Sequence, residues 1–122
     1  MPAALVIEDD DDIRRLLEVV LQQEGFTVTT AANGTDGIAA LTTALPDLAL
    51  VDVGLPDMEG YEVVRRARAE ISGRIVMLSA RTQDADIQAG LDVGADAYLT
   101  KPFRPLQLRK DLRRILGGGD PA

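Results

Sequence analysis

The chain has 122 residues, of which 46% are hydrophobic and 27% are charged, the length and composition of one folded domain. It contains no cysteine and no histidine, which excludes disulfides, thiolate chemistry and imidazole ligands or bases. Its chemistry must rest on carboxylates, hydroxyls, lysine and arginine, so a bound ion would be a hard cation such as Mg²⁺ or Ca²⁺. The net charge of −7 argues against binding to nucleic acid or to a membrane surface, because phosphates would be repelled.

The charge is unevenly distributed along the chain. Residues 1–62 hold 13 acidic and 2 basic residues, whereas residues 63–122 hold 7 acidic and 11 basic residues. This segregation predicts a concentration of negative potential at one place. No run approaches the ~18 apolar residues of a membrane helix, and acids from position 8 onward are unlike a signal peptide. We therefore expect a cytoplasmic protein without membrane contact.

Short apolar or β-branched runs alternate with segments of helical periodicity. The expected strands cover residues 3–7, 26–30, 48–51, 75–78 and 97–99. The expected helices follow them: from a cap at Asp11 or Asp12 to Gly25, from a cap at Asn33 to Pro46, from Glu59 to Glu70, from a cap at Thr82 past Leu91, and a last one burying Leu108, Leu112, Ile115 and Leu116. Residues 1–116 form the predicted domain, and the glycine-rich residues 117–122 form a flexible tail or linker stub.

This alternation predicts right-handed βαβ crossovers and a parallel sheet covered on both faces, a doubly wound α/β fold. Ligands of such sheets bind at the carboxyl ends of the strands. The first expected strand ends at Glu8 and Asp9, the third at Asp52, the fourth at Ser79, and the fifth just before Lys101. Each signal is weak alone, since an acidic run before a helix is commonly only a cap. Their coincidence at one edge of the sheet indicates a functional site.

Crowded carboxylates repel one another unless a cation lies between them. Mg²⁺ prefers octahedral oxygen ligands and uses one or two carboxylates. Asp9 and Asp52 suit direct coordination, the backbone carbonyl of Gly54 could supply a third oxygen, and Glu8 could hold a metal-bound water.

A lysine and a serine at the same edge favour phosphoryl chemistry. Ser79 and Lys101 are expected where they can bind oxygens of a phosphoryl group attached to one of the carboxylates. Aspartate side chains do act as nucleophiles that form aspartyl phosphates.

Four segments together resemble the receiver domain of two-component response regulators. They are VIED at 6–9, VDVGLPDMEG at 51–60, MLSAR at 77–81 and GADAYLTKPF at 94–103, and the resemblance extends over roughly residues 3–116. It implies a flavodoxin-like fold of five helices around a five-stranded parallel sheet of strand order 2-1-3-4-5.

The resemblance implies a role for each acidic and basic site residue. Asp52 would accept a phosphoryl group from a sensor histidine kinase or a phosphotransfer protein. Glu8 and Asp9 would hold Mg²⁺, for which Mn²⁺ or Ca²⁺ can substitute, and Asp9 would be the direct ligand. Lys101 would pair with the acceptor and then with the phosphoryl oxygens. The domain would catalyse only its own phosphorylation and dephosphorylation, and is not expected to be an enzyme acting on other substrates.

Further residues would transmit the signal. By resemblance, the Ser79 hydroxyl moves to the phosphoryl group and Tyr98 alternates between outward and inward positions. The peptide bond before Pro102 would be cis. Phosphorylation would then shift the population of the surface formed by the fourth helix, the fifth strand and the fifth helix, toward an unknown downstream target.

Two positions depart from the pattern of many relatives. Gly54 lies two residues after Asp52, where a larger side chain is common, and Arg81 lies two residues after Ser79. We expect Gly54 to leave a path for the attacking water and Arg81 to cover it from the other side, so that both tune the lifetime of the phosphorylated form.

Other departures concern association. Ala97, Gln107 and Asp111 replace residues that related transcription-factor receivers use for dimerisation, so a monomer, or a dimer of a different kind, is expected even after phosphorylation. The basic residues of the last helix, Arg109, Lys110, Arg113 and Arg114, lack interleaved aromatics and are expected to form a solvated face rather than a nucleic-acid site.

The alternatives differ in what they require of these positions. A flavodoxin-like electron carrier needs a phosphate loop after the first strand, where residues 8–12 are acidic. A Mg²⁺-dependent aspartyl-phosphate hydrolase of the same fold class commonly has a second acid at the position of Gly54. A degenerate receiver that only binds partners would not need the complete set of Asp9, Asp52, Ser79 and Lys101. Whether the domain acts alone or within a longer regulator stays open.

Overall fold

The computed structural model describes residues 2–80 and 84–117, in which strands and helices alternate as the sequence predicts. The strands are β1 (Ala3–Ile7), β2 (Thr27–Ala31), β3 (Leu48–Asp52), β4 (Arg74–Ser79) and β5 (Ala97–Thr100). The helices are α1 (Asp11–Gln23), α2 (Gly34–Ala44), α3 (Gly60–Glu70), α4 (Asp84–Asp92) and α5 (Pro105–Gly117). None of the helices in the described part is long and apolar enough to cross a membrane.

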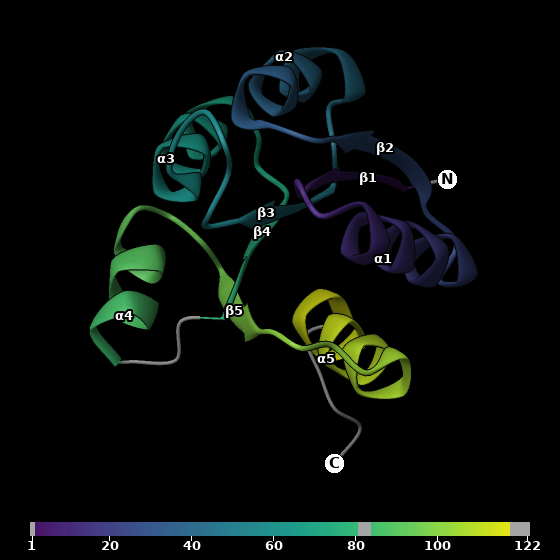
Figure 1. The fold of residues 1–122 in the computed structure, drawn as a ribbon. Helices are drawn as coiled ribbons and strands as arrows, with labels where there is room; N and C mark the ends of the chain where they lie inside the picture. The colour runs from purple at the N-terminus through teal and green to yellow at the C-terminus, as the bar shows by residue number, and fades with distance from the viewer. Residues whose placement is uncertain (1, 81–83, 118–122) are drawn as a thin grey trace.

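The five strands form one parallel sheet in the order β2-β1-β3-β4-β5. Helices α2, α3 and α4 cover one face of this sheet, and α1 and α5 cover the other (Figure 1). The doubly wound α/β fold and the strand order 2-1-3-4-5 are therefore confirmed. After β1 the chain adds β2 on one side of it and then adds β3, β4 and β5 on its other side. The strand order therefore reverses between β1 and β3, where such folds bind ligands.

An apolar core lies on each face of the sheet. Leu5 and Ile7 of β1 belong to the core beneath α2 and α3, whereas Ala4 and Val6 belong to the core beneath α1 and α5. The whole of β3 and residues 75–79 of β4 are buried, as expected for central parallel strands. The edge strand β2 instead exposes its threonines, and this explains why its sequence is more polar.

One helix end differs from the sequence-based expectations. The N-cap of α1 is Asp10, whose side chain accepts a hydrogen bond from the Ile13 N–H at 2.9 Å, so the expected cap at Asp11 or Asp12 is wrong. Every aspartate of this run is able to cap, and the choice depends on where the chain turns after β1. The expected cap of α4 at Thr82 lies outside the described residues.

The basic residues of α5 are not only a solvated face. Arg109 and Arg113 both pair with Glu24 at the end of α1, at 2.8 Å and 2.6 Å, and link the two helices on this face of the sheet. The hydrogen bond from Arg113 is the main reason why the pKa of Glu24 lies below its usual value. Lys110 and Arg114 remain exposed, as expected.

Candidate functional site

Three central strands and β5 deliver polar groups to one open hollow at their carboxyl ends. Asp52 and Ser79 are the last residues of β3 and β4, and Glu8 and Lys101 directly follow β1 and β5. The parallel registers set these ends side by side, with Asp52 opposite Leu78 in β4. Residues that line the hollow are Glu8, Asp9, Asp10, Ile13, Asp52, Gly54, Ser79, Ala80 and Lys101. The edge predicted from the sequence is thus where the polar groups gather.

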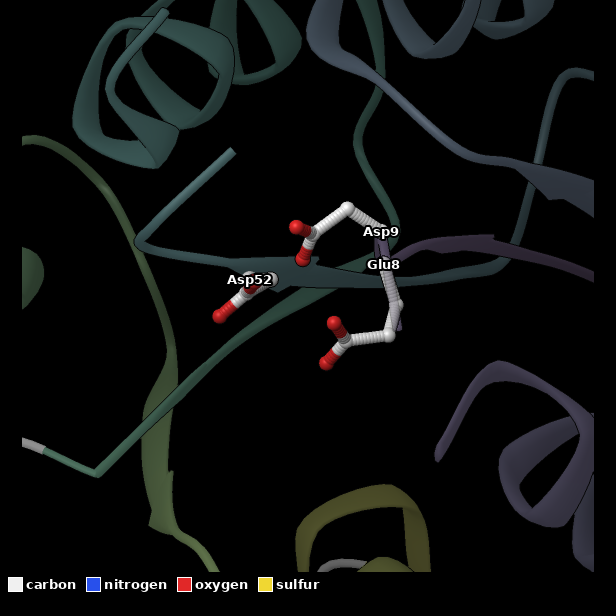
Figure 2. A group of neighbouring side chains, drawn as sticks. All are labelled: Glu8, Asp9 and Asp52. Atoms are coloured by element: carbon white, nitrogen blue, oxygen red, sulfur yellow. The ribbon is translucent and has the colours of Figure 1, made fainter. Parts of the chain in front are cut away.

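The carboxylates of Glu8, Asp9 and Asp52 form a compact cluster. One oxygen from each lies within 4.8 Å of the others. In Figure 2 the side chains of Glu8 and Asp9 extend from consecutive positions toward Asp52. Glu8 is fully buried, Asp52 is 5% exposed and Asp9 is exposed to solvent. The cluster therefore has a buried floor and one open side.

Lys101 lies between two of these carboxylates. Its Nζ is 2.7 Å from Glu8 Oε1 and donates a hydrogen bond of 3.1 Å to Asp52 Oδ1. Burial opposes the charged form of Lys101, but the carboxylates of Glu8 and Asp52 outweigh it and raise the pKa of Lys101 above its ordinary value. Lys101 is therefore a fixed positive charge beside the Asp52 side chain.

The two carboxylate oxygens of Glu8 have different surroundings. Oε2 accepts a hydrogen bond from the Asp10 N–H at 3.1 Å, but Oε1 is buried and has no donor in hydrogen-bonding geometry among the described residues. Its contact with Lys101 is thus an ion pair rather than a well-formed hydrogen bond. Burial of the carboxylate raises the pKa of Glu8 to about 7, against the opposing effect of Lys101.

These groups fit a divalent cation with oxygen ligands. The cluster offers carboxylate oxygens only, and a buried oxygen of Glu8 lacks a hydrogen-bond donor. Hard cations such as Mg²⁺ and Ca²⁺ prefer such ligands, and repulsion among the three carboxylates would be relieved by binding one. Gly54 lines the same hollow, so its backbone carbonyl is a further candidate ligand.

The loop that follows Asp52 is closed tightly against β3. The Gly60 N–H donates to the Val53 carbonyl at 2.8 Å, and Gly54 and Glu59 form an isolated antiparallel bridge. A Cβ atom at Gly60 would collide with the backbone oxygen of Asp52. Glycine is therefore required where α3 begins, because the helix starts directly against the backbone of Asp52.

The structure adds one residue that the sequence interpretation treated only as loop chemistry. Asp57 accepts hydrogen bonds from Gly34 N at 2.8 Å, Thr35 N at 2.9 Å and Thr35 Oγ1 at 2.6 Å. The Thr35 hydroxyl is the main reason why the pKa of Asp57 falls to about 2, and the two backbone N–H groups add to it. Pro56-Asp57 indicates a turn, but nothing in the sequence identifies the partner of the Asp57 carboxylate.

The other predicted site residues have different surroundings. Ser79 is 4% exposed and lines the hollow with Asp52. Tyr98 is half-buried and packs against the core beneath α2 and α3, and a Cβ at Gly90 would lie 3.1 Å from its ring. The peptide bond between Lys101 and Pro102 is cis. Arg81 lies outside the described residues.

This fold and its acidic pocket define a class of signalling domain. A family model described as the response regulator receiver domain matches residues 4–113. The chain belongs to the family of response regulator receiver domains of two-component systems.

Curated relatives carry the same kind of domain in longer proteins. The transcriptional regulatory protein AfsQ1 of Streptomyces coelicolor is 44% identical over 98% of this chain, and the match covers 53% of AfsQ1. The DNA-binding response regulator MtrA of Mycobacterium tuberculosis is 40% identical over 95% of this chain and 51% of MtrA. The chain therefore spans about half the length of these relatives.

Solved structures with the same fold match this chain over nearly the whole length of both proteins. The chemotaxis protein CheY4 of Vibrio cholerae superposes with a TM-score of 0.88 at 36% identity, over 95% of this chain and 99% of CheY4. The BeF3-activated receiver domain of DrrB gives a TM-score of 0.86 at 31% identity, over 94% and 97% of the two chains. The similarity thus includes both the fold and a substantial part of the sequence.

Proposed function

We propose that this domain receives a phosphoryl group on Asp52 from the phosphohistidine of a sensor histidine kinase or a phosphotransfer protein. The observation that carries the proposal is the position of Asp52, which lies within 4.8 Å of the Glu8 and Asp9 carboxylates and in hydrogen-bond contact with Lys101. Membership of the receiver family supports it independently. A second acid at the position of Gly54, as in the alternative hydrolase, is absent from the sequence.

Asp52 is the nucleophile of the proposed reaction. One of its carboxylate oxygens attacks phosphorus in line, the P–N bond to the donor imidazole breaks, and the imidazole leaves with the electron pair. Lys101 donates a hydrogen bond to Asp52 Oδ1 in the free domain, and it is close enough to bind the negatively charged phosphoryl oxygens after transfer. Later attack by water returns the free carboxylate and inorganic phosphate.

Asp9, Asp52 and the Gly54 carbonyl would hold Mg²⁺, and Glu8 would hold a water bound to it. When bound, the cation supplies positive charge for the phosphoryl oxygens, and Mn²⁺ or Ca²⁺ can occupy the same oxygen set. Glu8 also fixes Lys101 through their ion pair, so that the acidic residues have two tasks.

The proposed signal is a shift between two states of the domain. The phosphoryl group would draw the hydroxyl of Ser79 and the ammonium of Lys101 toward it. Movement of Ser79 would alter the packing of Tyr98 and the surface of α4, β5 and α5. This surface would then bind the downstream target, either as a separate partner or as another part of a longer regulator. We expect the domain to be a cytoplasmic monomer that does not itself contact DNA.

The test is intact mass after incubation with acetyl phosphate and MgCl₂. The parent protein should gain one phosphoryl group, and Asp52→Asn should gain none. Asp47→Asn is a matched control, because it removes another aspartate at the opposite end of the sheet, where Asp47 accepts a hydrogen bond from Ala3 N. The modification should disappear when EDTA replaces magnesium. A parent protein that stays unmodified under these conditions would contradict the proposal.

A further inference from the structure

The loop between β3 and α3, residues 53–59, carries both the Gly54 carbonyl and the backbone that follows Asp52. Its base is closed by the Gly54–Glu59 bridge and the Gly60–Val53 hydrogen bond. These contacts lie within the loop and do not attach its tip to the rest of the domain. The tip is attached by hydrogen bonds of Asp57 to α2, and Leu55 and Met58 of the same loop pack in the core beneath α2 and α3.

Asp57 binds the N-terminus of α2 with both carboxylate oxygens. Oδ1 accepts the Gly34 N–H, and Oδ2 accepts the Thr35 N–H and hydroxyl. The next N–H of the helix, at Asp36, is bonded to the side chain of Asn33 at 2.8 Å, as the sequence predicts for this cap. The free N–H groups of the first turn are thus shared between a local cap and a side chain that comes from the site loop.

Packing reinforces the same connection. Met58, next to Asp57, lies so close to Gly34 that a Cβ there would be 2.5 Å from Met58 Cγ and 3.2 Å from Asp57 Oδ1. A side chain at the first position of α2 would therefore have to displace the Met58 side chain and press on the Asp57 carboxylate.

We infer that Asp57 is a positioning residue of the phosphoacceptor site, one that ties the 53–59 loop to α2 and so holds the Gly54 carbonyl in place for the cation. The inference rests on the proposed function and adds a residue to it. Asp57 lies outside the group of residues that line the hollow and acts through the loop. The hydrogen bonds from Thr35 and Gly34 favour the charged form of the carboxylate and lower the pKa of Asp57 to about 2.

Asp57→Ala tests the connection. We expect the dissociation constant for Mg²⁺, measured by calorimetry on the otherwise intact chain, to rise about tenfold, the low end of the usual effect of losing a residue that positions a metal ligand. Phosphorylation by acetyl phosphate at limiting Mg²⁺ should slow to a similar degree and recover at saturating Mg²⁺. Asp57→Asn keeps one acceptor oxygen, so its Mg²⁺ dissociation constant should lie between those of the parent and Asp57→Ala.

Asp47→Ala is the matched control. Asp47 is also exposed and also accepts a hydrogen bond from a backbone N–H, that of Ala3 at 2.8 Å, but at the other end of the sheet. Its replacement should leave the Mg²⁺ dissociation constant within about twofold of the parent's, the usual size of a surface effect remote from a site. Equal constants for Asp57→Ala and the parent would overturn the inference and leave Asp57 as a helix cap only.

Gly34→Ala separates positioning of the loop from stability of the helix. Alanine favours helix formation over glycine, so a role limited to α2 predicts unchanged Mg²⁺ binding. Displacement of Met58 and Asp57 by the new Cβ predicts weaker binding instead.

Amide hydrogen exchange without metal reports on the loop itself. In Asp57→Ala the amides of Gly34 and Thr35 should exchange faster, and so should Gly60 if the loop is loosened. Faster exchange limited to α2 would count against the inference. An unphosphorylated parent would contradict the proposed function, but it would leave the exchange result and the Mg²⁺ constants to judge Asp57.

Discussion

Glu8 and Lys101 form an ion pair of 2.7 Å between residues that follow non-adjacent strands. β3 and β4 lie between β1 and β5, so the Lys101 side chain reaches across the ends of two strands to the buried carboxylate. Glu8, Asp9 and Asp52 bring three carboxylates to this place against the one ammonium of Lys101. The charge that remains when all are ionised is the charge that a divalent cation would neutralise.

Replacement of Lys101 should expose the cost of burying Glu8. Lys101→Met leaves a fully buried carboxylate without its counter-charge, so the free energy of unfolding should fall by about 2–3 kcal/mol, somewhat below the usual cost of breaking a buried pair because Lys101 is 17% exposed. In the double variant Glu8→Gln/Lys101→Met the loss should be smaller than in Lys101→Met alone. Urea unfolding without metal measures both. If the losses in Glu8→Gln and in Lys101→Met added up to the loss in the double variant, the two residues would not be coupled.

The raised pKa of Glu8 predicts how stability depends on pH in the absence of metal. Because the pKa is about 7 in the folded protein and 4.5 ordinarily, the folded state binds the proton more tightly. Stability should therefore decrease as pH rises from about 4.5 to 7, by about 3 kcal/mol at most, and level off above that range. Glu8→Gln should lack this component, so the difference between the two unfolding profiles isolates it. Saturating Mg²⁺ should reduce the difference at pH 8, because the cation stabilises the ionised carboxylate.

Strand ends were the part of the site that could be predicted from the sequence. Apolar runs stop abruptly at Glu8, Asp52 and Ser79, and parallel topology requires those ends to share an edge. Lys101 followed from the same topology, since it comes just after the last expected strand. Local pattern and sheet geometry together were sufficient for these residues.

Contacts between distant segments could not be predicted in this way. Asp57 and Thr35 are 22 residues apart, and Glu24 is 85 residues from Arg109. Charged residues on loops and helix ends have many possible partners, and no periodicity selects one of them. The cap of α1 was missed for a related reason, because adjacent aspartates are equivalent in sequence and differ only in backbone geometry.

Gly54 offers a direct test of what controls the lifetime of the phosphorylated form. It is exposed, and a Cβ built there meets nothing within 4 Å, so a larger side chain should fit without disturbing the fold. In Gly54→Met the side chain should cover the path of water to the phosphoryl group and lengthen the half-life several-fold, where a tenfold change would correspond to about 1.4 kcal/mol in the barrier. The half-life is measured by intact mass after removal of the phosphodonor. Gly54→Ala is the control of small volume, and equal half-lives for all three proteins would contradict this role.

Phosphorylation should not cause the domain to dimerise through the surface of α4, β5 and α5. Asp111 is occupied within its own helix, where it accepts a hydrogen bond from Gln107 at 3.0 Å and lies 3.3 Å from Arg114. Ala97 at the start of β5 has no charge to offer a second copy. Sedimentation velocity with and without beryllofluoride and Mg²⁺ should therefore give the same monomeric species at micromolar concentration. A tight dimer that forms only with beryllofluoride and is abolished by Asp111→Ala would contradict this prediction. Asp111 would then contribute to the association, although in the free domain it contacts Gln107 and Arg114 of its own helix.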